Sequence, residues 1–383
     1  MQNVSKRMKY SMRLIVLIIW ISICPLLVNA GTTVKNVILY IGDGMGITQI
    51  TSSRIYLMGA DGRFEMEKMP ITGLITTHSV DRLITDSAAG ATALASGYKT
   101  KNGMIGMNRD SVAVVTILEA ARDKGLSIGL ISTSSITHAT PASFAAHVSS
   151  RRSQSEVASQ LIDAQISLLL GGGKSFFLPQ ELSGSKRSDQ IDLRQLAVEK
   201  GYSIVQNKEE LQKIGKGPVL GIFALEGLQG DSSEPSLKDM TEAALKVLSQ
   251  NKKGFFLMVE GSQIDWAGHD NSFPDLWREM KAFDDAVAVG LQYSAENEKT
   301  LVIVTADHET GGLLIEDGHN DGKDLQIAWH LKGHTGTMVP LFVSGPKAEL
   351  FSGIKDNTEI PVILSELLGI RNFPRFQSSH PVK

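Results

Sequence analysis

The strongest constraint on the fold is the alternation of short apolar runs with stretches of helical periodicity. The runs contain five or six residues with almost no polar interruption, which is typical of strands buried on both faces. They predict strands at residues 37–41, 71–76, 128–132, 166–170, 220–224, 255–259, 301–305 and 339–343. The stretches between them predict helices at residues 47–58, 87–96, 113–124, 154–164, 236–250, 275–292 and 359–368.

Strands that alternate with helices predict an α/β fold, here a three-layer sandwich with a central, mostly parallel sheet and helices on both faces. We find no repeat and no clear linker, so residues 31–383 are expected to form a single domain. Residues 171–218 are rich in glycine, serine and charge, and we expect a surface excursion there. Within it, residues 171–175 resemble a fragment of a P-loop, but the required spacing is missing and a turn is favoured.

The first 30 residues have the pattern of a signal peptide. Basic residues precede an apolar run at residues 14–28, and a small-residue cleavage pattern ends at Ala30. The run is shorter than the roughly 20 residues that a membrane-spanning helix needs, and a retained signal anchor is the alternative. We therefore expect an exported protein, periplasmic or secreted, with no membrane association after the signal is removed.

Charge and cysteine content exclude several classes of function. The formal net charge is −3, and removal of the basic leader makes the remaining chain more acidic. A specific nucleic-acid partner is not expected, and any bound anion must meet local positive charge. The single cysteine, Cys24, lies in the leader, so thiolate metal sites are excluded from the mature chain.

Three predicted strands lead into acidic residues, namely Asp43, Glu260 and Asp307. One such residue could be a helix cap or a turn residue. The carboxyl ends of parallel strands meet at one edge of a sheet, however, where ligands bind. Carboxylates that gather there repel one another unless cations balance them.

Histidines extend this pattern. Asp265 and His269 are four residues apart and face the same way on a helical turn, His308 follows Asp307, and His334 precedes a strand. Each histidine alone could be a hydrogen-bonded core or surface residue. As a set without cysteine, these residues favour a catalytic zinc site.

Ser87 begins a predicted helix of small residues. The free N–H groups of such a helix start form an anion site. Ser87 could be an N-cap residue or a nucleophile.

Several segments, read in order, resemble the motifs of the alkaline phosphatase family. They are residues 40–46, 86–89, 96–103, 138–141, 147–151, 260–269, 305–308 and 334–336. The resemblance implies an alkaline-phosphatase-like fold. It also implies hydrolysis of small-molecule phosphate monoesters, with broad specificity, through a phosphoserine at Ser87.

The resemblance also implies the ligands of two zinc ions and a third cation. One zinc would take Asp265, His269 and His334. The other would take Asp43, Asp307 and His308, with Ser87 beside it. The third cation, usually magnesium, would take Asp43, Thr140 and Glu260. Arg151 would bind two phosphoryl oxygens, and the three ions would outweigh the four carboxylates in charge.

The chain departs from the best-known bacterial members at two positions, where it has His138 instead of aspartate and Trp266 instead of lysine. His138 is either a ligand of the third cation, which would favour zinc or cobalt over magnesium, or a hydrogen-bonded neighbour. Trp266 is expected to pack at the rim of the site. The segment between His308 and His334 is short, so a homodimer is only an alternative to a monomer.

Other functions and other histidines remain to be weighed. Phosphodiesterases and sulfatases are the nearest alternatives, and a non-catalytic metal- or phosphate-binding protein is the alternative from another class. The remaining histidines match no ligand position, and we expect core or surface roles for His78, His147, His319, His330 and His380.

Overall fold

The structure is a computed structural model that describes residues 34–377, so the predicted signal peptide and His380 lie outside the described residues. A ten-stranded sheet forms its centre, and only β13 runs antiparallel to its neighbours. In spatial order the strands are β14 (Gly353–Asp356), β2 (Ile71–Thr76), β13 (Val339–Ser344), β8 (Thr300–Thr305), β1 (Asn36–Gly42), β7 (Phe255–Gly261), β3 (Ser127–Ser135), β4 (Leu168–Gly172), β6 (Val219–Ile222) and β5 (Ser203–Val205).

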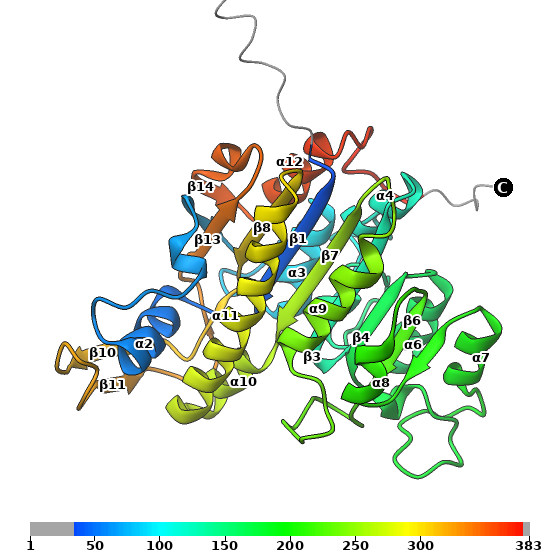
Figure 1. The fold of residues 1–383 in the computed structure, drawn as a ribbon, viewed down its shortest axis with the longest axis horizontal. Helices are drawn as coiled ribbons and strands as arrows, with labels where there is room; N and C mark the ends of the chain where they lie inside the picture. Colours follow the sequence, from blue (N-terminus) through cyan, green and yellow to red (C-terminus); the bar gives the residue numbers. More distant parts are fainter. Residues whose placement is uncertain (1–33, 378–383) are drawn as a thin grey trace, which may run out of the picture. The chain divides into compact units, whose positions relative to one another are not determined.

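Helices cover both faces of this sheet (Figure 1). One layer contains α2 (Ile47–Met58), α9 (Leu237–Leu248), α10 (Gln263–Asp270) and α11 (Phe273–Glu296), which pack on one another. The opposite layer contains α3 (Ser87–Ser96), α4 (Ile117–Asp123), α5 (Ala139–Ala142) and α12 (Glu359–Leu367). The other helices are α6 (Gln154–Asp163), α7 (Leu193–Glu199), α8 (Lys208–Lys213) and the single turns η2 (Met66–Lys68), η3 (Lys174–Phe176) and η4 (Ala348–Phe351). The predicted α/β sandwich with a mostly parallel sheet is confirmed.

The central strands explain why the polar residues meet at one edge. Every residue of β1, β7 and β8 is buried, as the uninterrupted apolar runs predicted. In the registers of these strands, Ile41 of β1 pairs with Glu260 of β7 and with Thr305 of β8. The three strands therefore end at one level, and the residues that follow them share one edge of the sheet.

The helix predicted to begin at residue 113 begins later. Ala113 and Val114 form isolated β-bridges with Met107 and Phe376. Thr116 then starts α4 with a capping box, because its side chain accepts from the N–H of Glu119 while the Glu119 carboxylate accepts from the N–H of Thr116.

The expectation of a surface excursion at residues 171–218 is wrong in part. The segment contains α7, β5 and α8, and β5 extends the main sheet at its edge. Phe177, Leu193 and Ala197 are buried there, so the segment contributes to the core. The P-loop-like residues do form a turn. Their N–H groups at residues 173–175 donate to the carbonyls of residues 224–226 and are not free to bind phosphate.

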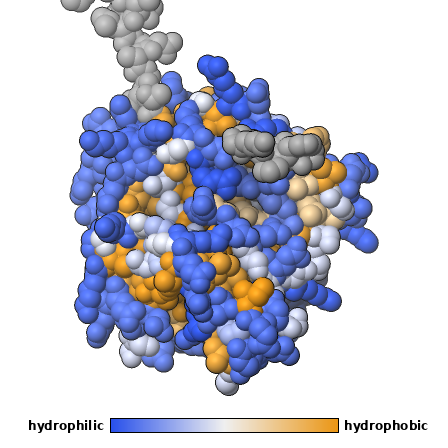
Figure 2. Space-filling model, turned by 90° about the vertical axis from the view of Figure 1, so that its right-hand side faces the viewer, coloured by the Kyte–Doolittle hydropathy of each residue, from blue (hydrophilic) through white to orange (hydrophobic). Residues whose placement is uncertain are grey.

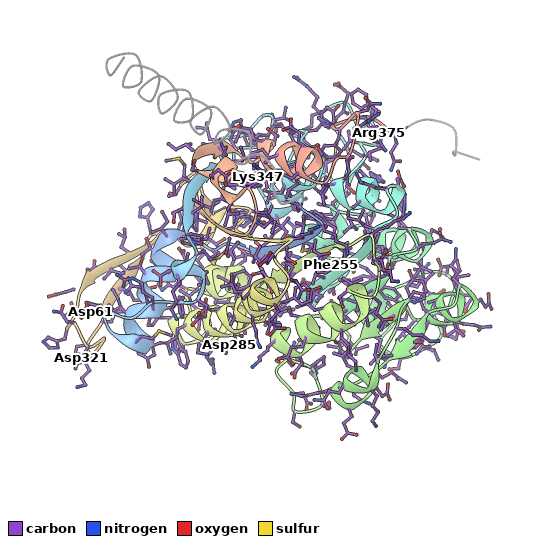
Figure 3. All side chains as sticks on the ribbon, turned by 45° about the horizontal axis from the view of Figure 1, so that its top comes forward. Asp61, Phe255, Asp285, Asp321, Lys347 and Arg375 are labelled. Atoms are coloured by element: carbon purple, nitrogen blue, oxygen red, sulfur yellow. The ribbon has the colours of Figure 1, made fainter. Side chains whose placement is uncertain are left out.

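Short strands that the sequence did not predict complete the fold. β9 (Glu309–Thr310) pairs with β12 (His334–Thr335), and β10 (Leu313–Asp317) pairs with β11 (Gln326–Trp329). The N–H of Ala60 donates to the carbonyl of Asn320 at 2.7 Å, which is why Asp61 and Asp321 lie at the same end of the molecule in Figure 3.

The surface is mixed in polarity. On the face shown in Figure 2, polar and charged residues surround separate apolar patches, as is ordinary for a globular protein. Among residues 34–377, no helix combines the length and the apolar character that crossing a membrane requires.

Candidate active site

Three buried carboxylates meet at the carboxyl ends of the central strands. Asp43 follows β1, Glu260 is in β7 and Asp307 follows β8, and none of the three is exposed to solvent. Both carboxylate oxygens of Asp43 lack a hydrogen-bond partner within the described chain, and so do Oε1 of Glu260 and Oδ2 of Asp307. Buried unpaired carboxylate oxygens are costly, so this cluster fits cations as its missing partners.

The side chains form three groups whose potential ligand atoms lie within 4.8 Å of one another. The groups are Asp43 with Asp307 and His308, Asp43 with His138 and Glu260, and Asp265 with His308 and His334. Because Asp43 and His308 each belong to two groups, the three groups lie side by side. The sequence predicted the first group. It predicted Asp43 and Glu260 of the second group and left His138 open as a ligand there, and it predicted Asp265 and His334 of the third.

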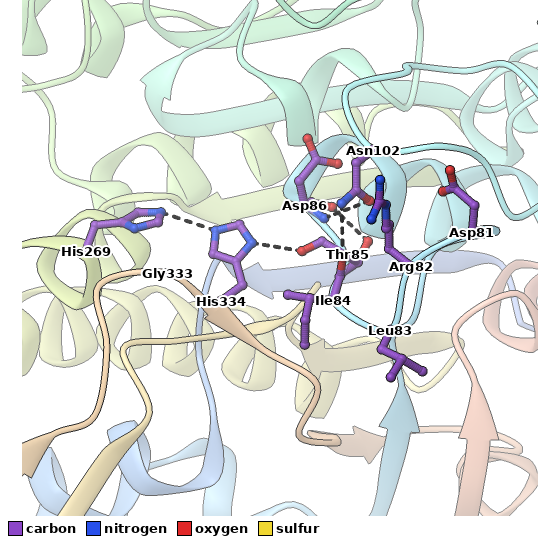
Figure 4. A pocket seen from close by; sticks show the side chains of 10 residues that line it. All are labelled: Asp81, Arg82, Leu83, Ile84, Thr85, Asp86, Asn102, His269, Gly333 and His334. Atoms are coloured by element: carbon purple, nitrogen blue, oxygen red, sulfur yellow. Dashed lines mark hydrogen bonds between the residues drawn. The ribbon is translucent and has the colours of Figure 1, made fainter.

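His269 belongs beside the third of these groups. Its Nε2 is 3.3 Å from Oδ2 of Asp265 and 3.2 Å from Nε2 of His334. The Nδ1 atoms of both histidines face backbone carbonyls, at 2.5 Å from Lys332 and 2.9 Å from Thr85 (Figure 4). A carbonyl at Nδ1 orients the ring and leaves Nε2 for a metal, so Asp265, His269 and His334 are arranged as one ligand set.

The group around Glu260 is supported by hydroxyls. Ser132 Oγ donates to Oε2 of Glu260 at 2.6 Å, and Ser262 Oγ lies 2.8 Å from Ser132 Oγ. Three buried atoms of this group have no hydrogen-bond partner within the described residues: Oε1 of Glu260, Oγ1 of Thr140 and Nδ1 of His138. The site near Glu260 therefore offers several polar atoms to a cation.

Trp266 lies beside this group. Its ring meets the ring of His138 edge-on, with centroids 6.4 Å apart. A Cβ on Gly227 would come within 2.5 Å of the indole, so the loop around Gly227 packs closely on Trp266. The expected packing role of Trp266 is consistent with these contacts.

Ser87 is the first residue of α3, and it is not the N-cap. Asp86 takes that role, because its side chain accepts from the N–H of Ala89 at 3.0 Å. Ser87 Oγ lies 3.2 Å from Nε2 of His308. One turn later, a Cβ on Gly90 would be 3.0 Å from the carbonyl oxygen of Asp307. The small residues of α3 thus bring Ser87 against the carboxylate cluster.

The guanidinium of Arg151 contacts both the cap of α3 and the histidine beside Glu260. Its Nη1 donates to Oδ2 of Asp86 at 3.1 Å, and its Nη2 donates to Nε2 of His138 at 3.2 Å. The N–H of Gly103 donates to the same Asp86 oxygen at 2.9 Å. The guanidinium is held in place, and its further N–H groups remain available to an anion.

Comparison with known proteins decides the family. The family model described as alkaline phosphatase matches residues 34–324, which contain ten of the eleven predicted site residues. The chain belongs to the alkaline phosphatase family. Members of this family are phosphoric monoester hydrolases, and the fold described above is an alkaline-phosphatase-like fold.

Individual alkaline phosphatases agree with this assignment. Alkaline phosphatase 4 of Bacillus subtilis is 42% identical over 313 residues, which are 78% of this chain and 65% of that protein, so the match spans slightly less than two thirds of the relative. The Escherichia coli K12 alkaline phosphatase is 31% identical, covering 88% of this chain and 86% of that protein.

A solved structure is similar as well. The alkaline phosphatase of the Antarctic bacterium TAB5 has a TM-score of 0.80 at 34% identity, covering 89% of this chain and all of that one. A variant of that enzyme with one histidine replaced by aspartate is described as having Mg bound in the M3 site.

In this alkaline phosphatase homologue, burial is the largest cause of the pKa shifts of three carboxylates and two histidines of the site. Burial raises the pKa of Glu260 to about 7 and that of Asp307 to about 6. It raises the pKa of Asp43 well above its ordinary value, with the nearby carboxylates adding to the effect. Burial lowers the pKa of His308 and of His138 to about 4, which keeps both rings in the neutral form that binds metals.

Sequence reasoning gave no role to several residues that support the site. Asp86 both caps α3 and anchors Arg151, and an aspartate directly before a predicted helix was a usable signal. Glu309 binds Gln49 and Thr335, which ties β9 to α2 and β12. Ser132 and Ser262 lie 130 residues apart, and no local pattern could have paired them.

The remaining described histidines take no part in the site. His147 lies 3.1 Å from Glu119 and 2.6 Å from the carbonyl of Gly106, which is a structural role. His78, His319 and His330 are exposed. Their expected core or surface roles are confirmed.

Proposed function

We propose that this protein hydrolyses phosphate monoesters, with Ser87 as the nucleophile that becomes phosphorylated. The observation that carries the proposal is the position of Ser87. Its Oγ lies 3.2 Å from His308, at the start of a helix, beside a cluster of unpartnered buried carboxylate oxygens, and the preceding residue, Asp86, binds Arg151.

The side chains imply a two-stage reaction. Ser87 Oγ forms a bond to phosphorus while the bond to the alcohol breaks on the opposite side, and water then cleaves the phosphoserine to release phosphate. The N–H groups at the start of α3 and the guanidinium of Arg151 would hold the phosphoryl oxygens throughout. A guanidinium that binds two free oxygens favours a monoester, since a diester has one fewer.

We propose two zinc ions and a third cation as cofactors. Asp265, His269 and His334 would hold one zinc, Asp43, Asp307 and His308 the other, and Asp43, Thr140 and Glu260 the third cation, with His138 beside it. When bound, the ions would supply positive charge that balances the carboxylates and favours the alkoxide of Ser87 and of the leaving alcohol. Magnesium at the third site is supported by the TAB5 variant, and the histidine here leaves room for zinc or cobalt.

We also propose export, with residues 1–30 as a removable signal peptide. This rests on the sequence pattern alone, because these residues lie outside the described part of the chain. Amino-terminal sequencing of the protein recovered from outside the cytoplasm would test it, and a mature chain that still begins at Met1 would contradict it.

A substrate panel tests the catalytic proposal. The metal-loaded protein is assayed with 4-nitrophenyl phosphate, bis(4-nitrophenyl) phosphate and 4-nitrophenyl sulfate. We expect the monoester to be strongly preferred, and Ser87→Ala to lower kcat by orders of magnitude while calorimetry still detects phosphate binding. Preference for the diester or the sulfate, or near-normal turnover by Ser87→Ala, would contradict the proposal.

A further inference from the structure

A crevice of about 780 Å³ opens beside the proposed site. One wall consists of residues 81–86 and Asn102, and the other consists of His269, Gly333 and His334 (Figure 4). This volume falls in the range of pockets that hold whole small molecules. It is much larger than a phosphoryl group requires, so it has room for another part of a substrate.

The crevice lies on the side where the leaving alcohol would be. Ser87 Oγ is next to His308, whose ring stacks on that of His334 with centroids 3.6 Å apart, and His334 lines the crevice together with His269. An in-line displacement sends the alcohol away from the nucleophile, so the alcohol would depart past these two histidines and along the wall formed by residues 81–86.

That wall is held rigidly at both ends. The N–H of Ser79 donates to the carbonyl of Arg82 at 3.1 Å. Asn102 accepts from the N–H of Asp86 at 3.2 Å and donates to the carbonyl of Ile84 at 3.0 Å. The carbonyl of Thr85 faces His334, as described above. Residues 82–84 therefore present their side chains from a fixed backbone, which lowers the entropic cost of binding.

The side chains of Arg82, Leu83 and Ile84 are exposed on this wall. Leu83 is 84% exposed and Ile84 is 41% exposed. Arg82 is exposed and makes no ion pair or side-chain hydrogen bond to residues 34–377. Asp81 also lines the crevice, but it lies on the far side of Arg82 from His269 and His334 in Figure 4. The other carboxylate that lines the crevice, Asp86, is paired with Arg151 at 3.1 Å, so Arg82 is the cation of this wall that is left to attract an anion.

We propose that Arg82, Leu83 and Ile84 form a binding surface for the leaving group and determine which monoesters are preferred. The favoured class is monoesters whose alcohol has an apolar or aromatic body and a second anionic group. Leu83 and Ile84 contact the body, and Arg82 attracts the second anion. This inference rests on the proposed phosphomonoesterase activity and specifies its substrates.

The test uses the metal-loaded protein and three monoesters, namely ethyl phosphate, benzyl phosphate and 4-carboxybenzyl phosphate. Arg82→Gln should lower the ratio of kcat/KM for 4-carboxybenzyl phosphate to that for benzyl phosphate about two- to fivefold, as expected for an exposed ion pair. The loss should appear in KM, and 1 M NaCl should abolish the wild-type preference. Leu83→Ser should lower the ratio for benzyl to ethyl phosphate by about the same factor, because it removes apolar contact area.

Arg371→Gln is the matched control, since Arg371 is also exposed, has no ion pair within the described chain and does not line the crevice. It should leave both ratios at the wild-type values. If the wild type hydrolyses all three esters but neither variant changes its ratio, the leaving-group surface is overturned and the proposed function stands. If the wild type hydrolyses none of the esters, the proposed function fails and the leaving-group surface fails with it.

Discussion

Asp43 shows how single residues determine the chemistry of this site. It takes part in two of the three potential metal groups, and both of its carboxylate oxygens lack a hydrogen-bond partner within residues 34–377. A buried carboxylate in that state is unstable without cations. The same residue therefore couples two neighbouring metal positions, and a change at one position should be felt at the other.

His138 provides a prediction at this scale. In His138→Asp, a neutral imidazole is replaced by a carboxylate, which adds a negative charge and an oxygen ligand near Glu260 and Asp43. We expect magnesium affinity to rise and activity to depend more strongly on added magnesium. Metal content and activity after dialysis against defined magnesium or cobalt measure both effects.

His78→Asp is the control for this change, because His78 is exposed and outside the metal groups. His138→Asp should also be combined with a substitution of Trp266, since neighbouring side chains couple. An unchanged metal preference and unchanged activity in His138→Asp would show that His138 is only a packed, hydrogen-bonded residue.

At the scale of elements, α3 has two tasks that meet at its first turn. In the proposed function its amino terminus presents Ser87 and free N–H groups to a phosphoryl group, and Asp86 caps that turn while it holds Arg151. A carboxylate at this position also interacts favourably with the helix dipole. The cap of α3 and the position of Arg151, the proposed substrate-binding residue, therefore depend on one side chain.

Asp86→Ala is predicted to damage both tasks. The lost cap should lower the free energy of unfolding by about 0.5–2 kcal/mol. The released guanidinium should raise KM for a monoester. Denaturant unfolding and steady-state kinetics measure the two effects.

Asp192→Ala is a matched control for the element. Asp192 caps α7 and pairs with Arg194 at 2.7 Å, but it does not belong to the site. It should lower stability by a similar amount without changing KM. If Asp86→Ala keeps the wild-type KM, the ion pair of Asp86 does not position Arg151 for substrate.

Among the helices and strands, the sequence predicted those whose bounds depend on the local pattern of residues. α2 and α3 have the predicted bounds, because their ends carry clear glycine and capping signals. The short strands β9 and β12 were not predicted, since each has two residues and forms only by pairing with the other. The same holds in the site. Recognisable motifs predicted the candidate ligand residues, whereas the link between Ser132 of β3 and Ser262, which follows β7, depends on the pairing of these two strands in the folded sheet.

For the whole molecule, the carboxylate cluster links metal binding to stability. Removal of the cations leaves Asp43, Glu260 and Asp307 buried together without balancing charge. Binding energy at such a site contributes to folding energy. A strong chelator should therefore both inactivate the protein and lower its Tm, on the order of 10 °C if the sites are tightly occupied. An unchanged melting curve would mean that the cluster is not a metal site.

The chelated protein should also show a pH dependence of defined sign. Burial raises the pKa of Glu260 to about 7 and that of Asp307 to about 6, so the folded chain binds more protons than the unfolded chain between about pH 4 and 7. The stability that these two groups contribute is then lost as the pH rises through that window. The Tm of the chelated protein should fall from pH 5 to pH 8, and it should fall less in Glu260→Gln, which removes one of the two titrations. If the Tm of the chelated wild type and that of chelated Glu260→Gln fall equally with pH, Glu260 does not cause the pH dependence.

The close approach of Gly90 to Asp307 constrains the part of the molecule that contains Ser87, and it does not involve the crevice wall at residues 82–84. Because a Cβ at Gly90 would meet the Asp307 carbonyl at 3.0 Å, α3 packs directly against the backbone that follows β8. A larger side chain at residue 90 would crowd the backbone of Asp307. At residues 82–84, in contrast, the hydrogen bonds to the wall involve the backbone, and the side chains are exposed. Substitution of these side chains should therefore change which esters are preferred while the proposed reaction at Ser87 stays the same.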